Sequence, residues 1–142
     1  MELIGITIDL LGQLDYVAVL VAAIASFVLG FLWYGPVFGK QWMKYVGMTA
    51  ERMKSVSRNK MTAGYLATFA TAFLEAMFLL FFTLLLQTQF WHTAIMIWFG
   101  FIFLSGTGII FWEQKTWKLF VLHTGYRLAN LLVIALVLSF FF

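Results

Sequence analysis

Four long runs of apolar residues, separated by short polar segments, make up most of the chain. They cover residues 17–33, 61–86, 93–112 and 119–142, and each contains at least 17 residues. A helix needs about 20 apolar residues to cross a ~30 Å hydrocarbon core. Backbone groups in lipid must be hydrogen-bonded within the segment, so only helices or the strands of a closed barrel can cross the membrane. Barrel strands would be about ten residues long and would alternate in polarity, so we expect helices. The pattern predicts an all-α integral membrane protein, a bundle of four transmembrane helices in one membrane domain over residues 1–142.

Composition supports a membrane protein and excludes several other classes. Of the 142 residues, 63% are hydrophobic and only 11% are charged, and the mean hydropathy is +0.96. A soluble domain carries about 25% charged residues, so we exclude soluble enzymes, nucleic-acid-binding modules and disordered chains. The chain has no cysteine, which excludes disulfides, thiolate metal sites and cysteine nucleophiles.

Basic residues are distributed unevenly among the polar segments. Residues 34–60 contain six Lys or Arg and one acid, and residues 113–118 contain two Lys. The amino-terminal tail and the turn at 87–92 contain neither Lys nor Arg. Eight of the nine basic side chains therefore lie on one side of the predicted bundle, and the positive-inside rule places that side in the cytoplasm. We expect both termini to face outside.

Residues 34–60 are predicted to contain an amphipathic helix in the membrane interface. Phe38, Trp42 and Tyr45 recur at helical spacing, while Lys40 and Lys44 lie off that line. Such a helix places its rings at the acyl boundary and its lysines among anionic headgroups. Pro36, just beyond the first run, is expected to stop the first helix because proline lacks a backbone N–H. The aromatic residues expected to anchor the helices at the interfaces are Trp33, Tyr34, Trp42, Tyr45, Trp91, Trp112 and Trp117.

Two charged residues lie within the apolar runs. Glu75 is near the middle of the second predicted helix, and Arg127 lies slightly to the cytoplasmic side of mid-depth in the fourth. A charge at the centre of a transmembrane helix costs about 2.5–3.5 kcal/mol on insertion scales, so each needs a partner or water. Their depths differ by roughly 7 Å at 1.5 Å per residue, which a long arginine side chain partly spans. We therefore predict a Glu75–Arg127 ion pair.

Other polar residues recur at helical spacing beside these two charges. Residues three, four or seven positions apart share one face of a helix, so the polar faces of the second and fourth helices should meet inside the bundle. The predicted intramembrane polar cluster consists of Thr68, Thr71 and Glu75 on the second helix and His123, Tyr126, Arg127 and Asn130 on the fourth.

Small residues predict where helices approach one another closely. The first helix carries an unbroken row of small residues four positions apart, and the third carries glycines among hydroxyl residues. Such positions permit tight packing, and in the third helix they also permit a local bend. The expected packing positions are Ala18, Ala22, Ser26 and Gly30 on the first helix and Gly100, Gly106 and Gly108 on the third.

Two interpretations of the polar cluster stay open. In the first, the Glu75–Arg127 pair is structural and only fixes the register of the helices; a buried ion pair is in any case weak evidence of stability. In the second, the pair belongs to a polar pocket that binds or moves a molecule or ion. His123 either forms an internal hydrogen bond or titrates. No catalysis, metal or cofactor is expected, because Glu75 has no second carboxylate at its depth and His92 and His123 lie far apart.

The stretch from Gly30 to Met43 resembles part of a known family. It reads Gly-Phe-Leu-Trp-Tyr-Gly-Pro-Val-Phe-Gly-Lys-Gln-Trp-Met. It resembles the bacterial membrane family called domain of unknown function seventeen sixty-one, whose members end their first helix in Gly-x-x-Trp-Tyr followed by Phe-Gly-Lys-x-Trp-Met. Further matches lie at residues 98–101, 111–113 and 125–128. The resemblance implies a four-helix protein of a bacterial cytoplasmic membrane and brings no established activity or catalytic residue.

Two hypotheses about function follow. In the first, the protein is a non-catalytic bundle that acts as a homo-oligomer or as an accessory subunit of a larger membrane complex, since it is small, at 16.3 kDa, and closed homo-oligomers are common. In the second, it is a small transporter or channel whose pathway uses Glu75, Arg127 and His123. A water-filled cavity at the level of the ion pair favours the second hypothesis, and a closed, dry pair favours the first.

Overall fold

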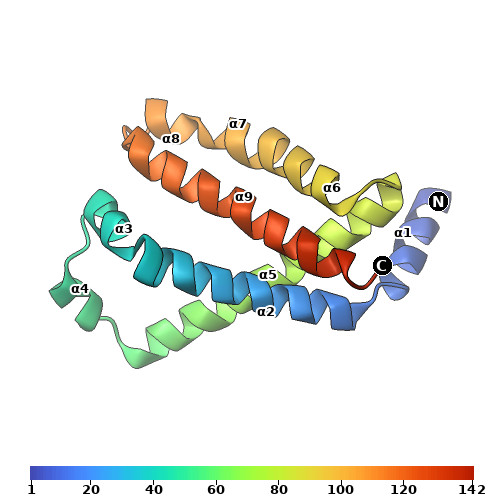
Figure 1. Ribbon diagram of the computed structural model, residues 1–142, viewed down its shortest axis with the longest axis horizontal. Coiled ribbons are helices and arrows are strands. Elements are labelled where there is room, and N and C mark those ends of the chain that lie inside the picture. The colour runs from blue at the N-terminus through green and yellow to red at the C-terminus, as the bar shows by residue number, and fades with distance from the viewer.

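The computed structural model describes residues 1–142 and contains helices and no strands (Figure 1). Four helices are long and apolar enough to cross a membrane, namely Tyr16–Val37, Arg58–Leu86, Phe90–Phe111 and Trp117–Ser139. The predicted all-α class with four candidate transmembrane helices is therefore confirmed.

Side-chain oxygens cap the long regular helices and decide where they begin. Such a cap satisfies a backbone N–H at the helix start that has no partner within the helix. Because the caps precede the apolar residues, the second and fourth transmembrane helices begin slightly earlier than the apolar runs. The capped helices are α2 (Tyr16–Leu32) by Asp15, α5 (Arg58–Leu86) by Ser57 and α9 (Trp117–Ser139) by Thr116.

The first transmembrane helix does not simply stop before Pro36. It continues from α2 into a π-helical turn, η1 (Trp33–Val37), which contains Pro36. Gly35 adopts the non-helical angles φ −109° and ψ −105° there, and the chain then enters α3 (Gly39–Val46). The helical angles thus end at Gly35, next to Pro36, as predicted. Helical structure resumes within a few residues in α3, which lies in the segment predicted to be amphipathic.

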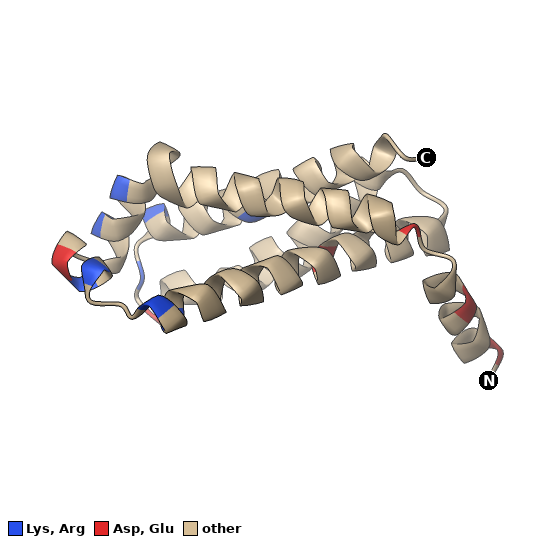
Figure 2. Cartoon of the chain, turned by 90° about the horizontal axis from the view of Figure 1, so that it is seen from below, with Lys and Arg blue, Asp and Glu red and all other residues tan.

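Two short helices lie at opposite ends of the bundle. α1 (Glu2–Gly12) is at the end where both termini lie, and α4 (Ala50–Lys54) is at the other end (Figure 1). Most Lys and Arg lie at the α4 end (Figure 2). The charge asymmetry along the sequence is therefore also an asymmetry in space.

The third transmembrane helix is irregular. The Ser105 hydroxyl donates to the carbonyl of Phe101, and the Thr107 hydroxyl to that of Leu104. Such bonds compete with the regular helical pattern, and the helix is interrupted at Thr107, where the sequence permits a bend. Its segments are α6 (Phe90–Ile97), the π-helical η2 (Trp98–Phe103), α7 (Leu104–Gly106) and α8 (Gly108–Phe111).

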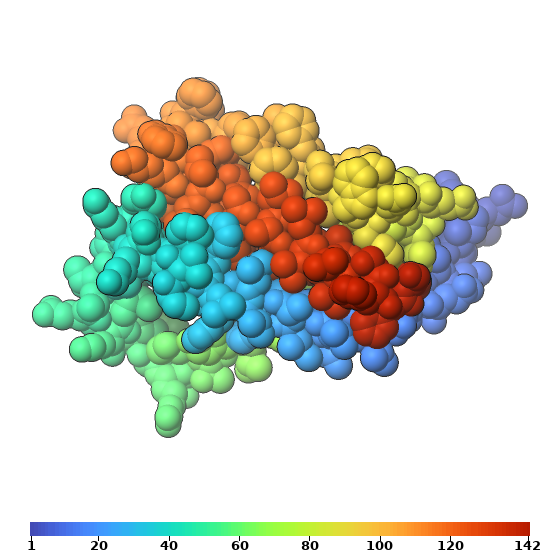
Figure 3. Space-filling view, viewed as in Figure 1, coloured from blue at the N-terminus to red at the C-terminus, as the bar shows by residue number.

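The hydrophobic core lies in the half of the bundle nearest the termini. There α2, α5, α6 and α9 pack around buried aliphatic side chains, among which Leu79, Leu80 and Ile134 are almost completely buried. α2 and α9 stay in contact along much of their length (Figure 3). α5 diverges from both toward the α3–α4 end (Figures 1 and 2). α5 therefore separates from α2 and α9 at the end of the bundle that carries the basic residues.

Two aromatic residues expected at the membrane interface turn into the bundle instead. The Trp33 ring lies 4.7 Å from that of Phe38 and 5.9 Å from that of Tyr126, and the Tyr34 ring lies 5.0 Å from that of Tyr126. Both rings are half-buried because η1 packs them against α9, and the anchor role expected of them stays a prediction. The Trp42 ring meets Tyr34 at 5.9 Å, so the aromatic face of α3 is partly covered by protein. Of the other expected anchors, Tyr45 is half-buried and Trp91, Trp112 and Trp117 are exposed.

The small-residue row on the first helix faces the bundle interior. Ala18, Ala22 and Ser26 are buried, and a methyl group added at Gly30 would lie 2.8 Å from the hydroxyl oxygen of Tyr126 on α9. Close approach at Gly30 therefore requires the absence of a side chain.

The glycines of the third helix behave differently from one another. A methyl group at Gly106 would lie 3.1 Å from the Phe120 ring on α9, so Gly106 is a contact position. A methyl group at Gly100 would meet nothing within 4 Å, and one at Gly108 would meet only Trp112 of the same segment. Within the chain, Gly100 and Gly108 face no other helix, so the packing role predicted for them stays a prediction.

Candidate functional site

The Glu75–Arg127 pair expected from the sequence is present in the structure. Arg127 Nη1 on α9 donates a hydrogen bond to Glu75 Oε1 on α5 at 2.8 Å. The pair is not sealed, since 45% of the Arg127 side chain and 26% of the Glu75 side chain are exposed. A charge pair at this depth therefore borders open space rather than packed side chains.

Asn130 links the ion pair to the first transmembrane helix. Its Nδ2 donates to Glu75 Oε2 at 2.8 Å, and its Oδ1 accepts a hydrogen bond from the Ser26 hydroxyl at 2.5 Å. Asn130 and Ser26 are both buried, and buried polar groups are tolerated when they are hydrogen-bonded. The network thus joins α2, α5 and α9 and gives each oxygen of the Glu75 carboxylate a donor.

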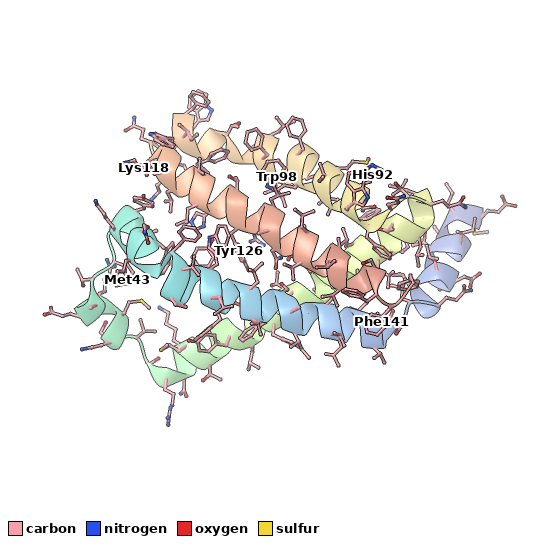
Figure 4. All side chains as sticks on the ribbon, viewed as in Figure 1. Met43, His92, Trp98, Lys118, Tyr126 and Phe141 are labelled. Carbon is pink, nitrogen blue, oxygen red and sulfur yellow. The ribbon has the colours of Figure 1, made fainter.

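This network lies in the wall of a cavity between α2, α5 and α9. The cavity has a volume of about 490 Å³, within the range of about 300–1,000 Å³ typical of small-molecule sites. Tyr126 lies between α9 and α2 beside it (Figure 4). The polar part of the wall consists of Ser26, Thr68, Thr71, Glu75 and Arg127.

Aromatic residues form much of the remaining wall. Phe31 and Tyr65, on α2 and α5, are 62% and 49% exposed on the outer side of the cavity. The Phe27 ring meets that of Tyr65 edge-on at 6.3 Å. The aromatic wall also includes Tyr34 and Tyr126. The cavity therefore joins a charged inner wall to an aromatic rim that faces the surroundings of the bundle.

Two further cavities border the ion pair. Glu75 also lines an apolar cavity of about 440 Å³ between α5, α6, η2 and α9. Arg127 also lines a smaller one of about 170 Å³ beside α7 and α8. The ion pair thus stands at the boundary between the polar cavity and two spaces on the side of the third helix.

Three members of the predicted polar cluster make no hydrogen bond to the ion pair. His123 Nδ1 and Tyr34 Oη share a hydrogen bond at 2.6 Å, which joins η1 to α9. The Thr68 and Thr71 hydroxyls donate to carbonyl oxygens one turn earlier in α5 at 2.8 Å. The two threonines nevertheless line the polar cavity, whereas His123 lines the smaller space beside α7 and α8.

The sequence predicts other roles for some residues of the cavity wall and no role for others. Ser26 is expected there as a packing residue and Tyr34 as an anchor, while Phe27, Phe31 and Tyr65 are not singled out. The sequence does contain a pattern that places Phe27 and Phe31 on the cavity wall. They are four positions apart, and each directly follows a member of the small-residue row, Ser26 or Gly30. No comparable signal marks Tyr65.

The arrangement can hold water or a small polar molecule against a charge pair. No three His, Cys, Asp or Glu side chains lie together, and the expectation that the protein binds no metal or cofactor stays a prediction. Exposed donors and acceptors in a cavity this size are features of a binding site.

Comparison with known proteins points to one family. Neither the curated proteins nor the solved structures give a match. A family model described as "Protein of unknown function (DUF1761)" matches residues 17–139. This is the family that the Gly30–Met43 stretch resembles, and the match spans all four transmembrane helices. The chain therefore belongs to the DUF1761 family.

Proposed function

We propose that the protein is a small, non-catalytic transporter or channel whose polar pathway passes the Glu75–Arg127 pair. One observation carries this proposal: the pair borders a cavity of about 490 Å³ instead of being closed off by packing. A pair that only fixed helix register would be expected to be enclosed.

The cost of an intramembrane charge supports this interpretation. Ionisable groups at this depth face a bundle interior or a water-filled space, because lipid does not solvate them. The exposed parts of Arg127 and Glu75 therefore need water or a solute in the cavity. At ~30 Å³ of liquid volume per water, the cavity has room for on the order of ten molecules.

The placement of the pair also suits a gate. It separates the polar cavity from the spaces beside the third helix. A solute that crossed the bundle by this route would have to pass or displace the Arg127–Glu75 contact. Oligomerisation would supply further helices around such a pathway.

The proposal is tested by solute entry into reconstituted vesicles. Vesicles that contain the protein are placed in isosmotic glycine, urea or potassium chloride, and swelling is followed by light scattering. We expect faster swelling than in empty vesicles with at least one solute. The Glu75→Gln/Arg127→Gln variant should swell at a different rate from the parent, because it lacks the contact that a solute has to displace, while Ile24→Val, on an exposed face of α2, should keep the parent rate. Swelling equal to that of empty vesicles in all three solutes would contradict the proposal.

A homo-oligomer is the second candidate, and the third transmembrane helix favours it. Only 6% of its apolar 18-residue stretch is buried within the chain, against 28–39% of the corresponding stretches in the other three helices. We propose that a second copy covers part of this face. The mass of the purified protein in detergent, measured by light scattering, should exceed one chain of 16.3 kDa; a monomeric mass at all concentrations would contradict it.

We also propose that the basic end lies in the cytoplasm, among anionic headgroups, and that both termini lie outside, in a bacterial cytoplasmic membrane. The support is the gathering of Lys and Arg at the α4 end, opposite the termini (Figure 2). A periplasm-dependent reporter fused after Phe142 should be active, and the same reporter at Thr49 should be silent. Equal activity at the two sites would rule out this orientation.

A further inference from the structure

We propose that the cavity selects zwitterions, molecules that carry both an oxyanion and a primary ammonium group, and that the zwitterion sits beside the Glu75–Arg127 pair. This proposal rests on the function above and names its substrate class. It follows from the hydrogen-bonding groups left open in the cavity wall, from the formal charge of the wall and from its aromatic rim.

The cavity offers open hydrogen-bond donors. A guanidinium group has five N–H donors, and Arg127 uses one of them, to Glu75. The Tyr126 hydroxyl borders the cavity and makes no hydrogen bond within the chain. An oxyanion such as a carboxylate or phosphate matches such donors, because guanidinium groups bind these anions in a two-point geometry.

The cavity also offers open acceptor capacity. A carboxylate has about four lone-pair sites, and Glu75 accepts only from Arg127 and Asn130. An ammonium group on the ligand can donate to the remaining sites. The aromatic wall adds to this preference, because the faces of Tyr and Phe rings attract cations.

The formal charge of the wall decides between an anion and a zwitterion. Arg127 and Glu75 are the only charged residues that line the cavity, so its formal charge is zero. A net charge is costly to bring into a site of low dielectric constant. A zwitterion adds no net charge, and its two groups can lie opposite the two protein charges with the signs alternating.

The rim of the cavity indicates that the zwitterion can enter from the membrane as well as from water. Phe31 and Tyr65 are exposed there, and the cavity lies between α2 and α5, which diverge toward the basic end (Figures 1 and 2). A phosphoethanolamine lipid headgroup and a free amino acid carry the same two groups. Their shared chemistry is an oxyanion and an ammonium a few bonds apart.

Native mass spectrometry of the detergent-purified protein tests the selection. Phosphatidylethanolamine and the anionic phosphatidylglycerol, with matched acyl chains, are added in equal amounts, with and without excess glycine. We expect an about tenfold preference for phosphatidylethanolamine, which corresponds to ~1.4 kcal/mol. The Glu75→Gln/Arg127→Gln variant should bind both lipids equally, whereas Ile24→Val should keep the preference.

The effect of glycine on lipid binding distinguishes the two sources of the ligand. Loss of bound phosphatidylethanolamine on adding glycine assigns the same site to soluble zwitterions, and retention assigns it to the lipid. If neither lipid is preferred and a parallel titration shows no glycine binding, or if phosphatidylglycerol is preferred, the proposal is overturned. A preference that persists in the double variant also overturns it. Vesicle swelling in urea or potassium chloride would still support a pathway in that case, so failure of the substrate class is distinguishable from failure of the function.

Discussion

Glu75→Gln alone is expected to lower the free energy of unfolding by about 2–3 kcal/mol, and adding Arg127→Gln is expected to restore most of the loss. The single change leaves a guanidinium charge without its partner. It also leaves one amide oxygen where two carboxylate oxygens accepted hydrogen bonds from Arg127 and the buried Asn130. A fully buried pair costs about 3–5 kcal/mol to break in this way. We expect less here because the pair is not fully buried: 45% of the Arg127 side chain is exposed.

A double-mutant cycle measures this coupling. Thermal or denaturant unfolding in detergent is compared for the two single variants, the double variant and the parent protein. Arg52→Gln, on the exposed helix α4, is the control and should change stability by no more than about 0.5 kcal/mol. Additive losses from Glu75→Gln and Arg127→Gln would show that the two groups do not stabilise each other.

Gly30→Ala is expected to destabilise the bundle by about 1–3 kcal/mol, the usual cost of overpacking. Its new methyl group would lie 2.8 Å from the Tyr126 hydroxyl oxygen, which is too close. Tyr126 cannot retreat easily, because its ring also packs against Trp33 and Tyr34. The clash is with the hydroxyl itself, so Tyr126→Phe in the same chain should restore much of the stability.

Gly64→Ala is the matched control for this change. A methyl group at Gly64 on α5 would meet nothing within 4 Å, and alanine is the better helix former. Melting temperatures should therefore fall for Gly30→Ala and not for Gly64→Ala. A Gly30→Ala protein as stable as its parent, or one that Tyr126→Phe does not restore, would show that α2 and α9 do not approach closely at this position.

The fold and the central contact of the site are predictable from the sequence because each has a strong local or energetic cause. Apolar runs of sufficient length define the four helices, and two isolated opposite charges at similar depth predict the Glu75–Arg127 pair. The place of Asn130 beside the pair is predictable because it lies three positions after Arg127, on the same face of the helix. These inferences need no knowledge of how the helices cross.

The cavity and the inward position of Tyr34 are not predictable in the same way. Tyr34 follows a long apolar run, so its position is typical of an interface anchor. It turns inward because η1 is a π-helical turn with a kink at Gly35, and a plain helix end before Pro36 would not produce this. Tyr65 lines the cavity only because α5 diverges from α2. Such a divergence depends on tertiary packing, which hydrophobic periodicity does not record.

The most direct test of a solvated cavity at the ion pair is the reactivity of single cysteines toward a water-soluble, membrane-impermeant thiol reagent. The natural chain has no cysteine, so it gives no background, and thiols react as the thiolate, which needs water. Thr71 lines the cavity, whereas its neighbour Ala70 is exposed on another face of α5 and does not line it. The account predicts that Thr71→Cys is labelled in intact membranes and that Ala70→Cys, at nearly the same depth, is not. Equal resistance of the two cysteines to labelling would contradict it.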